Sequence, residues 1–133
     1  MKKLLPVILL AVVVSACDVY VVEPRYDRRD SLTGYYDVEE YSETYDEFIN
    51  YSIRISKIGS YDEIRIHNFY AADISVRAYV DYDKITIPYQ VVDGYAIEGV
   101  GTMHFDDVHF SYSVKDLYQG APTDFCQADF WRD

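Results

Sequence analysis

The stretch Ile49-Asn50-Tyr51-Ser52-Ile53-Arg54-Ile55-Ser56 decides the fold class of this chain. Its large apolar side chains alternate with polar ones, and a β-strand places successive side chains on opposite faces of its sheet. The stretch therefore predicts a strand with one face in a core and the other in water. No segment between the alternating stretches that follow it keeps helical periodicity over ten residues.

Seven further segments show this alternation, and turn-forming residues separate them. The eight predicted strands cover residues 34–39, 49–56, 64–67, 74–80, 85–89, 95–105, 108–115 and 125–131. The predicted turns, all with Gly or Asp, include residues 59–60, 71–73, 81–83, 93–94 and 106–107. Connections this short favour antiparallel pairing of strands that are neighbours in sequence. With Gly99 and Gly101 allowing sharp bends, the pattern predicts an all-β domain at residues 33–133, an antiparallel eight-stranded up-and-down barrel.

Two details of this barrel follow from the same alternation. A two-residue turn at Asp106-Asp107 predicts one hairpin register: Phe105 faces Val108, Met103 faces Phe110, Gly101 faces Tyr112, and His104 faces His109. The predicted inward residues include many large ones: Tyr36, Tyr51, Tyr89, Met103, Phe105, Phe110 and Tyr112. We therefore expect side chains to fill the interior, which leaves no room for a large ligand cup.

The chain begins with a leader of the secretory type. Lys2 and Lys3 precede an eleven-residue apolar run, Leu4–Val14, which small residues follow. At about 1.5 Å per helical residue this run spans roughly half of a bilayer core, so it is too short for a stable transmembrane helix. The leader therefore predicts export.

The end of the leader, Val14-Ser15-Ala16-Cys17, resembles a bacterial lipobox. This resemblance implies cleavage between Ala16 and Cys17 and lipid attachment to Cys17. We expect residues 1–16 to be a lipoprotein signal peptide and residues 17–32 to comprise the lipidated cysteine and a tether, in which residues 19–22 form either a spacer or a short edge strand. The alternative is an ordinary signal peptide, with Cys17 free to form a disulfide with Cys126.

Composition limits the classes of partner. The chain has 23 acidic and 12 basic residues, a formal charge of −11, which argues against binding nucleic acid or anionic lipid headgroups. Its fifteen Tyr, six Phe and one Trp argue against an acidic disordered chain. Cys126 stands in an apolar context and is expected to be a buried, inert thiol.

Three short motifs carry a resemblance to a known family. They are Gly34-x-Tyr36, Ile85-Thr86-Ile87-Pro88-Tyr89-Gln90 and Ile97-x-Gly99-x-Gly101. With them the chain resembles small lipocalin-like (calycin-like) barrel lipoproteins of Bacteroidota, although lipocalins proper carry tryptophan where Tyr36 stands. The resemblance implies a barrel fold and a location in the cell envelope, with the outer membrane favoured over the inner, and it implies no reaction.

Exposed tyrosines are the leading candidates for a binding surface. By the alternation, Tyr35, Tyr41 and Tyr79 lie on outward faces, where tyrosine offers rigid contact area with a polar tip. They are therefore candidates for contact with a protein or glycan partner. Tyrosine is also an ordinary residue of half-exposed strands, so a structural role is the alternative.

Other chemistry has weaker support. His104 and His109 near the turn at Asp106-Asp107 could hold a metal, but such sites usually need three or four converging ligands, so we expect none. The acidic loop at residues 43–47 matches no calcium-binding spacing. The chain has no serine elbow, phosphate-binding glycine loop or redox cysteine pair, so we expect neither an enzyme nor a cofactor.

Three functions remain open at this point. The first is an anchored, monomeric binding module that contacts the membrane through its lipid and holds either a small apolar ligand at the barrel mouth or a partner on its tyrosines. The second is a structural envelope component, or an inhibitor of another exported protein, with a filled barrel. An enzyme is the least favoured.

Overall fold

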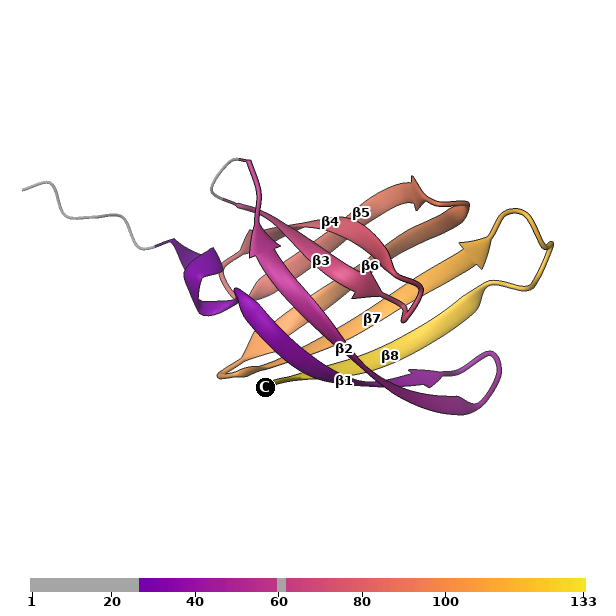
Figure 1. Ribbon diagram of the computed structural model, residues 1–133, viewed down its shortest axis with the longest axis horizontal. Helices are drawn as coiled ribbons and strands as arrows, with labels where there is room; N and C mark the ends of the chain where they lie inside the picture. Colours follow the sequence, from indigo (N-terminus) through magenta and orange to yellow (C-terminus); the bar gives the residue numbers. More distant parts are fainter. Residues whose placement is uncertain (1–26, 60–61) are drawn as a thin grey trace, which may run out of the picture.

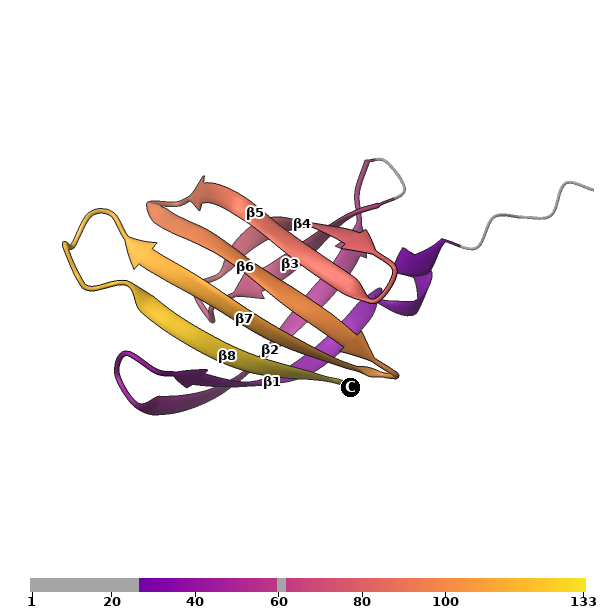
Figure 2. The same cartoon turned by 180° about the vertical axis from the view of Figure 1, so that it is seen from behind.

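The eight alternating segments form eight strands, and the computed structural model describes residues 27–59 and 62–133 (Figure 1). The strands are β1 (Gly34–Ser42), β2 (Glu47–Lys57), β3 (Glu63–Phe69), β4 (Ile74–Asp81), β5 (Lys84–Val92), β6 (Tyr95–His104), β7 (Asp107–Asp116) and β8 (Asp124–Arg132). Each strand pairs with its neighbours in sequence, and β1 pairs antiparallel with β8, which closes the barrel. The predicted all-β, eight-stranded up-and-down barrel is confirmed. Figure 2 shows the wall formed by β5 to β8 from behind.

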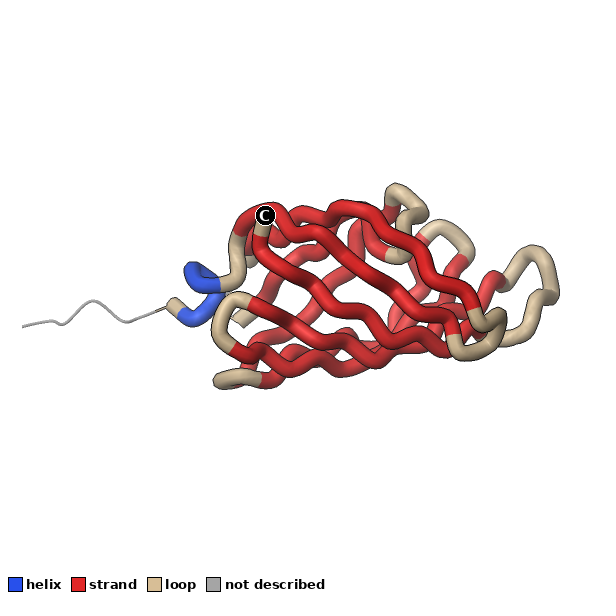
Figure 3. Tube along the Cα trace, turned by 90° about the horizontal axis from the view of Figure 1, so that it is seen from below, coloured by secondary structure: helices blue, strands red, loops and turns tan. Residues whose placement is uncertain are grey.

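The two ends of the barrel differ. The β2–β3, β4–β5 and β6–β7 connections lie at one end, which we call the closed end (Figure 1). The C-terminus and the short helix lie at this end as well (Figure 3). The other four connections surround the opposite end, which we call the mouth. In the part of the chain that the structure describes, no helix is long and apolar enough to cross a membrane.

Aromatic side chains fill the middle of the barrel. The rings of Phe110 and Phe130 lie 4.8 Å apart, and that of Tyr36 lies 6.2 Å from Phe130. Nearer the mouth, the ring of Phe69 lies 4.6 Å from that of Tyr112. All five side chains are buried. The barrel is therefore packed with side chains through its centre, as predicted.

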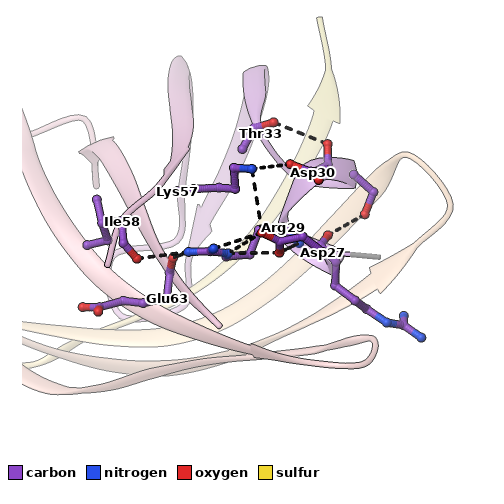
Figure 4. A network of polar contacts seen from close by, with 9 residues as sticks. Asp27, Arg29, Asp30, Thr33, Lys57, Ile58 and Glu63 are labelled. Carbon is purple, nitrogen blue, oxygen red and sulfur yellow. Dashed lines mark hydrogen bonds and ion pairs between the residues drawn. The ribbon is translucent and has the colours of Figure 1, made fainter. Parts of the chain in front are cut away.

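A short 3₁₀ helix, η1 (Arg28–Ser31), covers the closed end. Arg29 is buried there, and its guanidinium donates hydrogen bonds to the carbonyl oxygens of Ile58 (3.1 Å) and Glu63 (2.9 Å) and to the Asp27 carboxylate (Figure 4). Leu32 follows the helix and is 1% exposed, which stabilises the packed end by about 2 kcal/mol. Residues 27–32, predicted as part of a tether, are thus packed against the barrel; residues 17–26, including 19–22, lie outside the described residues.

A second arginine joins η1 to the last strand. Arg132 donates hydrogen bonds to the carbonyl oxygens of Ser31 and Thr33, and its guanidinium lies 5.1 Å from the centre of the Tyr36 ring. The Tyr36 hydroxyl in turn donates to the carbonyl oxygen of Leu32 at 2.6 Å. These bonds satisfy carbonyl groups that the short helix leaves unpaired.

The predicted register of the β6–β7 hairpin is wrong by two residues. The structure pairs Met103 with Val108, Gly101 with Phe110, Gly99 with Tyr112, Thr102 with His109 and His104 with Asp107. The turn is therefore Phe105-Asp106, and Phe105, predicted to point inward, is 93% exposed with φ at +56°. The reason is packing: a Cβ on Gly99 would lie 2.4 Å from Tyr112 Cβ, and one on Gly101 would lie 2.6 Å from the Phe110 ring.

A β-bulge in β5 overturns the inward placement of Tyr89. Ile87 pairs with Gly99 and Gln90 with Ile97, so two residues of β5 oppose one of β6. The inward and outward positions are exchanged after this bulge, so Tyr89 is 64% exposed and Gln90 is buried. The Gln90 side chain bonds both backbone groups of Arg77 at 2.9 Å, which replaces ladder hydrogen bonds between β4 and β5.

Candidate functional site

The inward face of β1 changes from apolar to polar as the strand approaches the mouth. Tyr36 and Val38 are buried in the core, and the next two inward residues, Glu40 and Ser42, are 2% and 8% exposed. Beside them Asp124, the first residue of β8, is 5% exposed. Two carboxyl groups are therefore buried at the mouth, where burial is costly without polar partners.

Glu40 is held by a tyrosine on the neighbouring strand. The Tyr51 hydroxyl donates a hydrogen bond to Glu40 Oε1 at 2.7 Å and lies 3.5 Å from the Tyr112 hydroxyl. Burial is the main reason that the pKa of Glu40 rises from 4.5 to about 7; within this net shift the Tyr51 hydrogen bond acts to lower the pKa and the nearby Asp124 charge acts to raise it. Close to neutral pH, Glu40 is thus divided between its neutral and charged forms.

The second oxygen of the Glu40 carboxyl keeps a small solvent-accessible area. Tyr51 is the only hydrogen-bond partner of this carboxyl in residues 27–59 and 62–133. Among the same residues, no fully buried side-chain oxygen lacks a partner. Since Glu40 also lines the pocket described below, its second oxygen is reached from that pocket.

Asp124 accepts hydrogen bonds from two hydroxyl groups. Ser42 Oγ donates to Oδ1 and the Tyr70 hydroxyl donates to Oδ2. Ser42 Oγ also accepts a hydrogen bond from the backbone N–H of Tyr45 at 3.1 Å, which ties the β1–β2 turn to the mouth. Burial, followed by the charges of Glu40 and Asp124, raises the pKa of the Cys126 thiol, so this free cysteine is protonated; it is buried, as predicted.

Tyr70 occupies a strained position in the β3–β4 turn. Its φ is +61°, in the left-handed region that costs a bulky residue roughly 1–2 kcal/mol. Its ring lies 6.0 Å from that of Tyr95, edge to face, and its hydroxyl reaches Asp124. These contacts offset the strain and fix the ring at the mouth.

A pocket of about 320 Å³ opens between these groups. Its lining includes Glu40, Glu47, Asp124, Tyr45, Ile49 and Tyr70. A second hollow of about 210 Å³ shares Tyr45, Tyr70 and Asp124 with it and extends toward the β7–β8 loop. The described lining of both hollows contains no lysine, arginine or histidine. The mouth is thus an acidic site with aromatic walls.

The tyrosines predicted as an interface do not form one patch. Tyr35 and Tyr41 lie toward opposite ends of β1, whereas Tyr79 lies on β4, with β2 and β3 between. Tyr35 is 63% exposed. Tyr41 is half-buried: its hydroxyl donates to Asp46 at 2.6 Å, and its ring lies 4.7 Å from that of Phe48. Ala16 and Cys17, the predicted cleavage and lipid-attachment residues, lie outside the described residues.

The two histidines near the β6–β7 turn are separated by their register. His109 lies between Asp129 Oδ1 (2.7 Å) and Gln127 Oε1 (2.9 Å), and the hydrogen bond to Asp129 raises its pKa. His104 packs instead against the Phe105 ring, 4.8 Å away. In residues 27–59 and 62–133, no cluster of three or more His, Cys, Asp or Glu side chains is arranged to hold a metal ion.

Glu40, Ser42, Tyr70 and Asp124 were not among the predicted site residues. The first strand was predicted to end at residue 39, although the alternation that makes Tyr36 and Val38 inward continues to Glu40 and Ser42. A carboxylate at an inward position is an exception to the usual pattern and is the signal that could have located the site.

No protein-family model matches this chain, and none of the curated proteins is similar to it in sequence.

Proposed function

We propose that this chain is a lipid-anchored protein of the bacterial cell envelope and that its barrel is a non-catalytic binding module. The observation that carries the proposal is the difference between the two ends: η1 covers one, and a pocket of about 320 Å³ occupies the other. This volume is at the low end of the range for small-molecule sites, which supports a compact ligand.

The anchor and the pocket belong to opposite ends. Asp27, the first described residue, is the N-cap of η1 at the closed end (Figure 4). If Cys17 carries lipid, the connecting residues span at most about 35 Å and join the barrel at the end opposite the mouth. An anchor attached there leaves the mouth free to face the aqueous side.

The lining argues against a large apolar ligand. Phe69, Phe110 and Phe130 are fully buried and occupy the space beneath the mouth. Two buried carboxyl groups, Glu40 and Asp124, face the remaining space. An anionic apolar dye such as ANS should therefore bind the native protein weakly. Strong, saturable ANS uptake would support an apolar-ligand carrier instead.

The filled centre of the barrel favours a second candidate, a structural envelope component or an inhibitor that uses the outer surface. The two candidates differ at the mouth. If the barrel is only structural, native mass spectrometry of protein released gently from envelopes should show no bound small molecule. If the mouth binds a ligand, part of the protein should carry an added mass, and the fraction that carries it should be smaller in the Asp124→Asn variant.

The anchor has its own test. Intact mass of the protein purified from membranes should exceed that of the polypeptide Cys17–Asp133 by a diacylglycerol group, with or without a further acyl chain. The Cys17→Ser variant should lose this addition and leave the membrane fraction. An unmodified, soluble wild-type protein would overturn the lipid-anchor proposal.

A further inference from the structure

The buried acids of the mouth have no cationic partner within the described chain. Glu40 and Asp124 form no ion pair with any lysine, arginine or histidine of residues 27–59 and 62–133. Among the described residues their hydrogen-bond donors are neutral side chains, namely the hydroxyl groups of Tyr51, Ser42 and Tyr70 and the thiol of Cys126. A buried carboxylate is stabilised when a positive charge comes close to it, so a cationic ligand would provide the positive charge that the described residues do not place there.

The acceptor that such a ligand needs is already in place. The second oxygen of Glu40 is reached from the pocket and has no hydrogen-bond partner among the described residues. An ammonium group has only donors, so it can bond this oxygen while leaving the Tyr51 hydrogen bond intact.

Aromatic walls favour the same ligand. Tyr45 and Tyr70 border both hollows of the mouth, and Tyr95 borders the second. The electron-rich face of a tyrosine ring attracts cations, most strongly where water is excluded. Carboxylate oxygens together with aromatic rings are a lining suited to an organic cation.

From these observations we infer that the mouth binds a small protonated amine, with its ammonium group at Glu40 and Asp124 and its carbon skeleton against Tyr45 and Tyr70. The inference depends on the proposed binding function and adds the class of ligand to it. Because no group of three metal-ligating side chains converges in the described residues, a divalent metal ion is less suited to this site than an amine.

Calorimetric titration of the purified full-length protein near pH 8 tests the inference. The probes are 2-phenylethylamine, the uncharged 2-phenylethanol, the anionic 3-phenylpropionate and calcium chloride. The amine should bind at least about tenfold more tightly than each of the other three, which corresponds to a difference of about 1.4 kcal/mol.

Matched variants locate the binding. Glu40→Gln and Asp124→Asn should each weaken amine binding about tenfold or more, as expected for loss of a charge-assisted hydrogen bond. Glu39→Gln removes an equal charge from the adjacent, outward-facing residue and should leave binding unchanged. Tyr45 is 46% exposed in a turn, so its variants should fold: Tyr45→Leu should weaken binding several-fold, and Tyr45→Phe should not.

The outcomes separate the two proposals. If the alcohol or the carboxylate binds as tightly as the amine, and Asp124→Asn alters that binding, the mouth is a binding site but the cation assignment is wrong. If calcium binds most tightly, the site is a metal site and the inference fails. If none of the probes binds, both the inference and the proposed role of the mouth are overturned.

Discussion

Replacing Glu40 with glutamine should stabilise this protein at alkaline pH and have a much smaller effect at acidic pH. The native state raises the pKa of Glu40 from 4.5 to about 7 because the carboxyl is buried beside Asp124. Since the native state holds the proton more tightly than the unfolded chain, this group contributes stability that is complete below pH 4.5. The contribution is lost as the pH rises through about 7.

The expected magnitude follows from the shift. One pKa unit corresponds to 1.36 kcal/mol, so between the two limits the ionisation of Glu40 costs the folded state about 3 kcal/mol. Between pH 5.5 and pH 8.5 the same relation gives about 2 kcal/mol. A glutamine amide does not ionise, and its oxygen still accepts the Tyr51 hydrogen bond, so the variant lacks this cost.

Urea unfolding followed by far-UV circular dichroism measures the effect. The quantity of interest is the difference in unfolding free energy between Glu40→Gln and wild type, which should increase by about 2 kcal/mol from pH 5.5 to pH 8.5. Guanidinium chloride is unsuitable because its cation could occupy the mouth. The control variant, Glu39→Gln, changes an exposed residue and should show almost no such increase. A pH-independent difference for Glu40→Gln would refute the assignment of a buried, titrating carboxyl to the mouth.

Three further substitutions test the packing and the closed end. Gly99→Ala should lower the unfolding free energy by about 2 kcal/mol in urea titrations, because its Cβ would lie 2.6 Å from the Ser111 carbonyl oxygen, and an unchanged midpoint would contradict the close packing of β6 on β7. Phe105→Gly should raise the unfolding free energy by about 1 kcal/mol, and with it the thermal midpoint, because Phe105 is exposed at φ +56°, where glycine has no backbone strain. A lower midpoint would show that the Phe105 ring has a stabilising contact. Arg29→Met should lower the unfolding free energy by about 3 kcal/mol and speed amide hydrogen exchange in residues 27–32, because the carbonyl oxygens of Ile58 and Glu63 lose their hydrogen-bond donor. Unchanged exchange would mean that other contacts hold η1 in place.

Alternation was sufficient to predict the barrel because each strand has one face in the core. Ile64 and Ile66 in β3 are two residues apart and buried, and in β4 every second residue from Ile74 to Val80 is buried. Where the prediction was wrong, the deciding interaction was not local. Two acidic residues suggested the turn Asp106-Asp107, but the hairpin shifts so that glycines of β6 lie beneath Phe110 and Tyr112.

The site was harder to predict than the fold because its members are distant in sequence. Glu40 and Asp124 meet only because β1 pairs with β8, and that pairing depends on closure of the whole barrel. Tyr70 joins them from a turn whose backbone lies in the left-handed region, which its sequence, Tyr70-Ala71-Ala72-Asp73, does not favour. No local sequence motif marks these residues; the closure of the barrel brings them together.

Buried charged groups have an ion-pair partner at the closed end of the barrel, whereas those at the mouth have none among the described residues. At the closed end, Arg29 lies against Asp27 and donates to backbone carbonyl oxygens, so its charge is neutralised and its donors are used. At the mouth, the donors that Glu40 and Asp124 find in the described part of the chain are all uncharged, and the ionisation of Glu40 lowers stability. Apolar residues of similar volume would pack there at lower cost. Asp124 fixes Ser42 and Tyr70, but the ionisation of Glu40 only lowers the stability of a purely structural barrel. A barrel that binds a cation uses both acids, and this difference supports the proposed binding function over the structural one.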